Sequence, residues 1–226
     1  MENRPMPTDT IPAPTALKAV AHETLVTSLR NAHALEKQVI AVLEPQLKQL
    51  TDFPELHARL SEHVRETREQ ARRLEAGLET CGASTSMVKD ALLSVMGFGQ
   101  SSIQGFSDDA VLKAVVADMM TEHLEIATYR TLLVLADMAG KPDLRPRLEA
   151  SLREEEAMAE WFDQNLDAIT HRFVEVKAVK EAKAAAAAQE KAAAPAPATP
   201  RPSGDQAPAA GAAPRPATPA DRSSDT

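Results

Sequence analysis

The feature that most constrains the fold of this chain is the presence of acidic residues inside the apolar stripes of four helical segments. The residues concerned are Glu36, the pair His63 and Glu66, the pair Glu122 and Glu125, and Glu155 within a run of three glutamates. A carboxylate that faces a protein core costs several kcal/mol unless it is paired or binds a metal. The chain must therefore fold so that these groups meet one another or a cation.

Apolar residues recur at helical spacing in four segments, at about residues 15–50, 54–81, 107–140 and 142–176. Each predicted helix is therefore roughly 30 residues long, or about 45 Å at 1.5 Å per residue. Pro45 lies inside the first segment, and we expect it to bend that helix without ending it. Gly82 and Gly140 are predicted to end the second and third helices.

The second and third segments are joined by a connection of about 25 residues, which is much longer than an antiparallel turn requires. It contains one short apolar helix, predicted at about 86–96, followed by three glycines. Such a connection is typical of a crossover that runs along a helix bundle. The sequence therefore predicts an all-α fold, a four-helix bundle with up-down-down-up order and one long crossover.

The two ends of the chain differ in composition from its middle. Residues 1–14 contain four prolines and predict a flexible arm, and residues 15–177 form the predicted four-helix domain. Residues 178–226 form a tail rich in alanine and proline, which we expect to be disordered, although KEAKAAAAAQEKAAA within it favours helix by propensity alone.

Composition narrows the classes of function. The net charge of −8 and the absence of a basic stripe argue against nucleic acid as a partner. No apolar signal segment and no uninterrupted apolar run of membrane-spanning length is present, so neither a membrane location nor secretion is predicted. The single cysteine, Cys81, cannot form an internal disulfide. We therefore expect a cytoplasmic protein.

Carboxylates on facing helices are hard oxygen ligands, and a bundle that gathers them at mid-height can hold a pair of iron or manganese ions. The predicted ligands are Glu36 from the first helix, His63 and Glu66 from the second, Glu122 and Glu125 from the third, and Glu155 from the fourth. Residues three apart on a helix share one face, which is why His63 pairs with Glu66 and Glu122 with Glu125.

Each of these residues also has a structural interpretation. His63 is equally consistent with a hydrogen-bonded core histidine, and Glu36 with a solvent-facing partner of Lys37. Glu154, Glu155 and Glu156 form a charge run, in which only Glu155 has the register of a buried ligand. Tyr129, one turn after Glu125, either bonds a ligand carboxylate or simply packs.

Four motifs together resemble the YciE/YciF-type ferritin-like family: ALEKQ followed by Pro45, HVRET with Gln70 three residues on, EHLEIATYRTLLVLADMAG, and LREEEA. The resemblance covers about residues 17–175. It implies a ferritin-like four-helix domain, commonly dimeric, associated with bacterial stress responses and carrying a di-metal centre. The activity within the family is poorly settled.

The chain departs from the ferritin pattern at two positions. That pattern has a histidine three residues after the glutamate of the second and fourth helices, where this chain has Glu69 and Met158. Two functions remain open. One is a stress-associated metal protein, with an oxidase- or peroxidase-like activity as one of its forms. The other is a non-catalytic, dimeric helical scaffold with a degenerate site. A storage cage is disfavoured, because neither the tail nor the resemblance indicates a shell of many subunits.

Overall fold

The computed structural model describes residues 13–85 and 109–193 of the chain. Within these ranges the protein consists of four long helices and one 3-10 turn, with no strand: α1 (Pro14–Leu47), α2 (Pro54–Thr80), α4 (Ala110–Met138), η1 (Pro142–Leu144) and α5 (Arg145–Ala193). The predicted all-α, four-helix fold is confirmed. The expected short helix at 86–96, most of the N-terminal arm and the tail after residue 193 lie outside the described residues.

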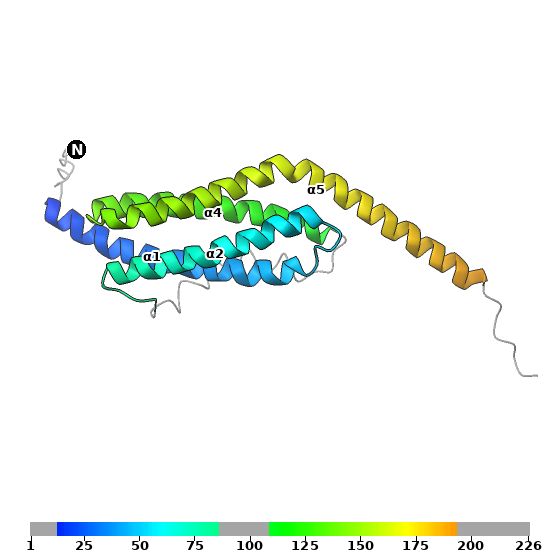
Figure 1. Ribbon diagram of the computed structural model, residues 1–226, viewed down its shortest axis with the longest axis horizontal. Helices are drawn as coiled ribbons and strands as arrows, with labels where there is room; N and C mark the ends of the chain where they lie inside the picture. The colour runs from blue at the N-terminus through cyan, green and yellow to red at the C-terminus, as the bar shows by residue number, and fades with distance from the viewer. Residues whose placement is uncertain (1–12, 86–108, 194–226) are drawn as a thin grey trace, which may run out of the picture. The chain divides into compact units, whose positions relative to one another are not determined.

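The helices have the predicted up-down-down-up order (Figure 1). α1 and α2 are antiparallel and joined by residues 48–53, whereas α2 and α4 run in the same direction. Side-chain contacts mark the two ends of the bundle. Lys141 donates to the carbonyl of Thr80 at one end, and Arg172 donates to the carbonyl of Asp52 at the other. α1 continues through Pro45 to Leu47, as the sequence predicted.

Prolines begin two of the four long helices, and glycines follow the ends of two. Pro14 and Pro54 occupy the first turns of α1 and α2, where a missing N–H is not needed for the helix. Gly82 and Gly140 follow α2 and α4 with φ of 72° and 67°, a left-handed conformation that glycine adopts without strain. At Gly140 a Cβ would also meet Lys18 Nζ at 2.8 Å, which would require the flexible lysine side chain to move.

Apolar side chains of the bundle form two separate clusters. The first is built around Leu25, Leu29, Leu74, Leu78 and Leu132, and the second around Leu43, Leu60, Val115, Met158 and Phe162. Between these two sets each helix contributes buried polar residues, among them Glu36, Gln70, Glu122 and Glu155. The core therefore consists of two apolar clusters, one toward each end of the bundle, with a polar layer between them.

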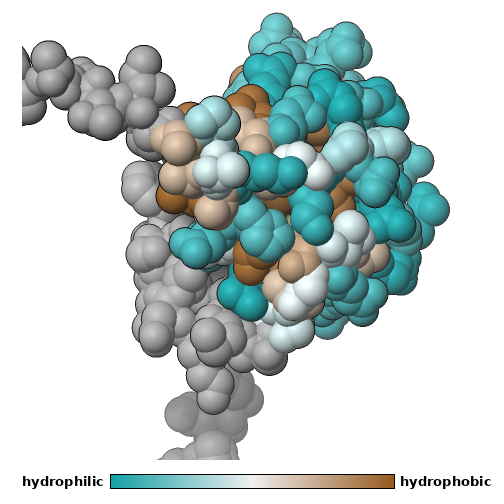
Figure 2. Space-filling view, turned by 90° about the vertical axis from the view of Figure 1, so that its left-hand side faces the viewer, coloured by the Kyte–Doolittle hydropathy of each residue, from teal (hydrophilic) through white to brown (hydrophobic). Residues whose placement is uncertain are grey.

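The unit Met1–Ala184 is compact, and the chain from Ala185 on forms a second unit of which only helical residues 185–193 are described. The end of the first unit drawn in Figure 2 carries mostly hydrophilic side chains, with small hydrophobic patches between them. Among the described helices, none has the length and apolarity needed to span a membrane.

Truncation of the second apolar cluster should destabilise the bundle strongly. Leu60 is fully buried, so Leu60→Ala should lower the free energy of unfolding by about 2–5 kcal/mol, through lost burial and the cavity that remains. Leu17, which is 41% exposed, is the matched control. Leu17→Ala should change the free energy of unfolding by no more than about 0.5 kcal/mol. Urea unfolding followed by circular dichroism measures both. Equal effects of the two substitutions would contradict the packing described here.

Candidate metal centre

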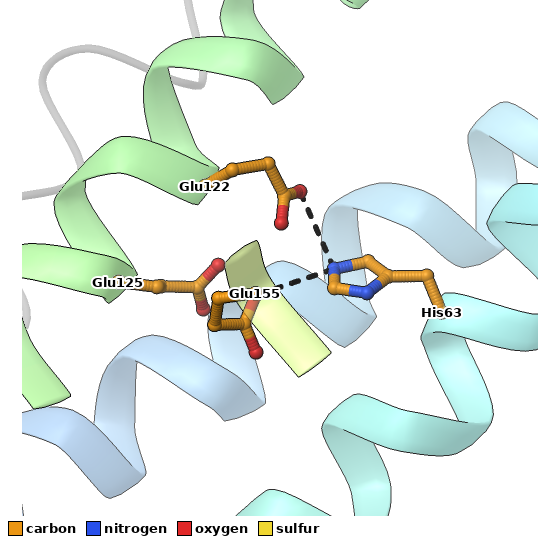
Figure 3. Close-up of side chains that lie close together, drawn as sticks. All are labelled: His63, Glu122, Glu125 and Glu155. Atoms are coloured by element: carbon orange, nitrogen blue, oxygen red, sulfur yellow. Dashed lines mark ion pairs between the residues drawn. The ribbon is translucent and has the colours of Figure 1, made fainter. Parts of the chain in front are cut away.

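The polar layer contains a histidine and several glutamates that point toward one another from different helices. His63 comes from α2, Glu122 and Glu125 from α4, and Glu155 from α5 (Figure 3). One potential ligand atom from each of these four residues lies within 4.8 Å of the others. All four side chains are at most 2% exposed. Four groups that are far apart in sequence therefore converge on one small volume.

The separations around His63 are those of ion pairs. Its Nε2 lies 3.3 Å from Glu122 Oε1 and 3.9 Å from Glu155 Oε2, and its Nδ1 lies 3.4 Å from Glu66 Oε2. Neither ring nitrogen makes a well-directed hydrogen bond. The imidazole therefore has carboxylates on both sides, with Glu122 and Glu155 on the side of the cluster.

Several buried oxygens of the cluster have no hydrogen-bond partner among the described residues. These are Oε2 of Glu36, Oε2 of Glu122, and both carboxylate oxygens of Glu125 and of Glu155. An unsatisfied buried carboxylate oxygen is costly, and most buried polar atoms in folded proteins are paired. Metal–oxygen and metal–nitrogen bonds of about 2.0–2.2 Å place two ligand atoms of one ion up to about 4.4 Å apart. The four donors, which lie within 4.8 Å of one another, could therefore hold a metal ion if they moved together by a few tenths of an ångström.

Burial also changes the protonation of these carboxyl groups. Removal from water raises the pKa of Glu36 to about 8, although the hydroxyl of Tyr129 and the charge of His63 act in the opposite direction. Burial, reinforced by the charge of Glu36, raises the pKa of Glu125 well above its usual value. Burial does the same for Glu155, against the opposing charge of His63. Without a cation, the cluster therefore favours bound protons.

The pKa values of His63 and Glu66 shift in opposite directions. Burial lowers the pKa of His63, but the negative charge of Glu122 and contacts with Glu66 and Glu155 outweigh it, so the pKa lies well above its usual value. The contact with His63 lowers the pKa of Glu66, and Arg59 contributes at 3.0 Å. The side chain of Glu66 is 25% exposed and lies outside the converging group. Of the six residues predicted as ligands, Glu66 is thus the one that contacts the Nδ1 side of His63, away from Glu122 and Glu155.

Glu36 joins the cluster from α1. It is 1% exposed, and the hydroxyl of Tyr129 donates to its Oε1 at 2.5 Å, which leaves Oε2 without a partner. Glu36 therefore does not face solvent beside Lys37, and Tyr129 bonds a carboxylate of the predicted set. This hydrogen bond limits the orientations that Glu36 can adopt.

The three consecutive glutamates of α5 have three different environments. Glu155 is fully buried, Glu156 pairs with Arg130 at 2.6 Å on the surface, and Glu154 lies between these extremes. Both guanidinium nitrogens of Arg73 donate to Glu154, at 2.6 and 2.9 Å, and Gln70 donates to it at 3.0 Å. Gln70 is itself completely buried, and its Oε1 has no partner.

The two positions at which this chain departs from the ferritin pattern have non-ligand environments. Met158 is fully buried in the second apolar cluster, and Glu69 pairs with Arg72 at 2.6 Å on the surface. His63 is consequently the one imidazole among the converging residues. The centre is richer in carboxylates than the ferritin pattern.

Sequence reasoning did not identify one buried polar pair beside the cluster. Gln46 Nε2 donates to Asp118 Oδ2 at 2.7 Å, and these side chains are 7% and 6% exposed. Burial raises the pKa of Asp118 to about 7, the hydrogen bond from Gln46 lowers it, and the charge of Glu122 raises it. The available signal was the register of Asp118, which lies one helical turn before Glu122 on the same face of α4.

Comparisons with known proteins agree with this architecture. The family described as "Domain of unknown function (DUF892)" matches residues 20–175. A solved structure from Xanthomonas campestris (XCC3681) is 30% identical, covers 70% of this chain and 98% of its own, and has a TM-score of 0.59. YcfI from Rhodopseudomonas palustris is 25% identical over 70% of this chain and 98% of its own, with a TM-score of 0.56. The E. coli stress protein YciF, at 22% identity, 66% and 97% coverage and a TM-score of 0.58, shows the shared fold.

The raised pKa of Asp118 predicts a pH-dependent effect of Asp118→Asn on stability. Because the folded state holds the Asp118 proton up to about pH 7, ionisation of this group lowers stability progressively between its usual pKa of 3.8 and about 7. Asparagine keeps an acceptor for Gln46 and cannot ionise. The gain in Tm from Asp118→Asn, measured with chelator present, should therefore be several degrees larger at about pH 8 than at about pH 5. A gain that is independent of pH would contradict the burial of an ionisable Asp118.

Proposed function

Because the chain belongs to the DUF892 family, to which its YciE/YciF-type motifs pointed, we propose that its four-helix bundle holds a carboxylate-rich pair of divalent iron or manganese ions. We propose further that this centre serves a bacterial stress response in the cytoplasm. The stress role rests on the family resemblance and on the description of the E. coli relative as a stress protein.

The observation that carries this proposal is the set of unpaired carboxylate oxygens in the polar layer. Glu36, Glu122, Glu125 and Glu155 together bring four negative charges when ionised, and His63 brings none when neutral. Two divalent cations balance four carboxylates, whereas one would leave a buried excess of negative charge. The charge of the layer therefore favours two ions over one.

Each residue has a distinct role in this proposal. The four glutamates provide oxygen ligands, and His63 provides Nε2, the ring nitrogen on the side of Glu122 and Glu155. Glu66 Oε2, which lies 3.4 Å from Nδ1, would accept a hydrogen bond from the N–H at that nitrogen and so fix the tautomer and orientation of the ring. Tyr129 holds Glu36 Oε1 and leaves Oε2 free for an ion.

Hard oxygen ligands suit iron(II), manganese(II) and magnesium, and one imidazole gives limited preference for the transition metals. When bound, iron or manganese ions would supply redox chemistry with oxygen or peroxide as the oxidant. The protein would contribute a dry environment, because the two apolar clusters enclose the polar layer from both ends of the bundle.

The alternative, a dimeric scaffold, has its own support in the surface of α4. Val116, Met120 and Leu124 follow one another at four-residue spacing and are between 45% and 54% exposed. Such a stripe is typical of a helix that packs against a partner, and a second copy of this chain is the partner that we propose. Self-association is compatible with either function, whereas a scaffold has no need of metal.

The metal centre can be tested with two adjacent residues of α5. Wild-type protein offered Fe(II) or Mn(II) should bind about two ions per chain, since two divalent ions balance the buried carboxylates. Glu155→Gln removes a buried ligand and should reduce this to about one or fewer, while Glu156→Gln changes a surface residue paired with Arg130 and should leave it unchanged. Elemental analysis after gel filtration measures the content.

The same measurement separates the two functions. Wild-type protein that retains fewer than about 0.2 ions per chain after both metals have been offered would support the scaffold and exclude the proposed centre. Equal metal content in the Glu155 and Glu156 variants would place bound metal outside the polar layer.

Glu125→Gln should have opposite effects on the metal-free and metal-loaded protein. Burial and the charge of Glu36 raise the pKa of Glu125, so its ionisation destabilises the metal-free fold as pH rises above 4.5. A neutral glutamine removes that cost, and Tm should rise by several degrees in chelator at about pH 8. With Mn(II) present, the variant should gain less stability than wild type, because it has lost a ligand. Thermal unfolding with and without metal tests the reversal, and a variant that is less stable in both conditions would contradict it.

A further inference from the structure

Three acidic side chains lie at the margin of the polar layer, and two of them are neutralised by arginine. Glu66 pairs with Arg59 at 3.0 Å, and Glu154 makes a two-pronged ion pair with Arg73. A guanidinium at each of these positions repels an approaching cation. The third acid, Asp118, forms no ion pair with Lys or Arg in the part of the chain that the structure describes. Its one hydrogen-bond partner there is the neutral amide of Gln46.

Two unpartnered oxygens accompany Asp118. Oε1 of Gln46 makes no hydrogen bond within the described residues, although the side chain is more than nine-tenths buried and its amide contacts Asp118. Oε2 of Glu122, one helical turn along α4 on the same face, is also without a partner. Burial is the main cause of the raised pKa of Asp118, and the charge of Glu122 adds to it.

The exposure of these residues decreases toward the centre. Gln46 is 7% exposed, Asp118 6%, Glu122 2% and Glu155 fully buried. The two apolar clusters flank the polar layer along the bundle, and Thr67, Gln70 and Ser151 are further buried polar residues between them. Gln46, Asp118 and Glu122 thus offer a cation several buried oxygen atoms beside the centre, and among the described residues the cationic group paired with them is His63, at Glu122.

We propose that Asp118, Gln46 and Glu122 form an outer cation site through which divalent metal ions reach the buried centre. Asp118 attracts the hydrated ion in its ionised form, and Gln46 turns its amide so that Oε1 replaces one of the ion's water ligands. Glu122 has oxygens for both sites and passes the ion inward, toward His63 Nε2 and Glu155. Two carboxylates and one amide make a weak site for a hard divalent ion, which suits transit better than retention.

This inference rests on the proposed metal function, so its test separates the rate of metal uptake from the final amount. Metal-free protein is mixed with Co(II), whose visible absorption changes when protein ligands replace water. The expected result for Asp118→Asn is an initial uptake rate lower by on the order of tenfold, because a steering charge is lost, with the same final metal content as wild type. Gln46→Met, which removes Oε1 at similar volume, should also slow uptake without lowering the final content.

The matched control is Asp137→Asn, which removes the same charge from the same helix at a surface residue paired with Arg145. It should load at the wild-type rate. A second comparison uses Arg59→Gln and Arg73→Gln, which should not accelerate uptake if ions avoid the Glu66 and Glu154 positions.

The outcomes are distinct. Equal rates for wild type, Asp118→Asn and Gln46→Met would overturn the outer site and leave the proposed centre intact, as would faster uptake by either arginine variant. A lower final content in Asp118→Asn would make Asp118 a ligand of the centre itself and would also overturn a transit role. Absence of Co(II) binding by wild type would overturn both the outer site and the proposed function.

Discussion

The structure of this bundle depends on the cost of burying carboxylates without a compensating charge. Glu36, Glu122, Glu125 and Glu155 occupy one layer, and each is there because it falls on the buried face of its helix. Protons or cations must neutralise such a layer, and the raised pKa values show the proton-bound alternative. The remaining polar contacts hold the margins of the layer in place: Tyr129 fixes Glu36, and Arg73 fixes Glu154.

Much of this fold could be predicted from hydrophobic periodicity, because a helix with a 3.6-residue repeat shows which side chains face the core. The same register identified Glu36, Glu122, Glu125 and Glu155. It could not distinguish Glu66 from the others, because a residue one turn from His63 lies near the edge of the buried face, where Arg59 holds it. Contacts across 72 and 81 residues, from Gln46 to Asp118 and from Arg73 to Glu154, depend on how helices meet and leave no local signal.

Membership of the DUF892 family establishes the bundle more firmly than its chemistry, because one fold supports many sites. What is particular to this chain is the pattern around the layer. Met158 fills an apolar position where the ferritin pattern has a histidine. Arg59 pairs with Glu66, and Arg73 pairs with Glu154. In the proposed centre, the donor set would have limited metal preference, and the arginines would leave one of the three acidic positions open to cations. Selection among metals would then depend on supply and uptake as well as on the ligands.

The division of the core into two apolar clusters has a consequence for cooperativity. Each cluster draws on segments of several helices, and the layer between them contains groups that repel one another when ionised. When these groups are ionised and no cation is bound, we expect the two halves of the bundle to be only weakly coupled through the layer and to open as separate units, in the way that foldons do. Ions that cross-link α1, α2, α4 and α5 at mid-height would join the halves, so that occupancy of the centre sets whether the bundle unfolds in one step or two.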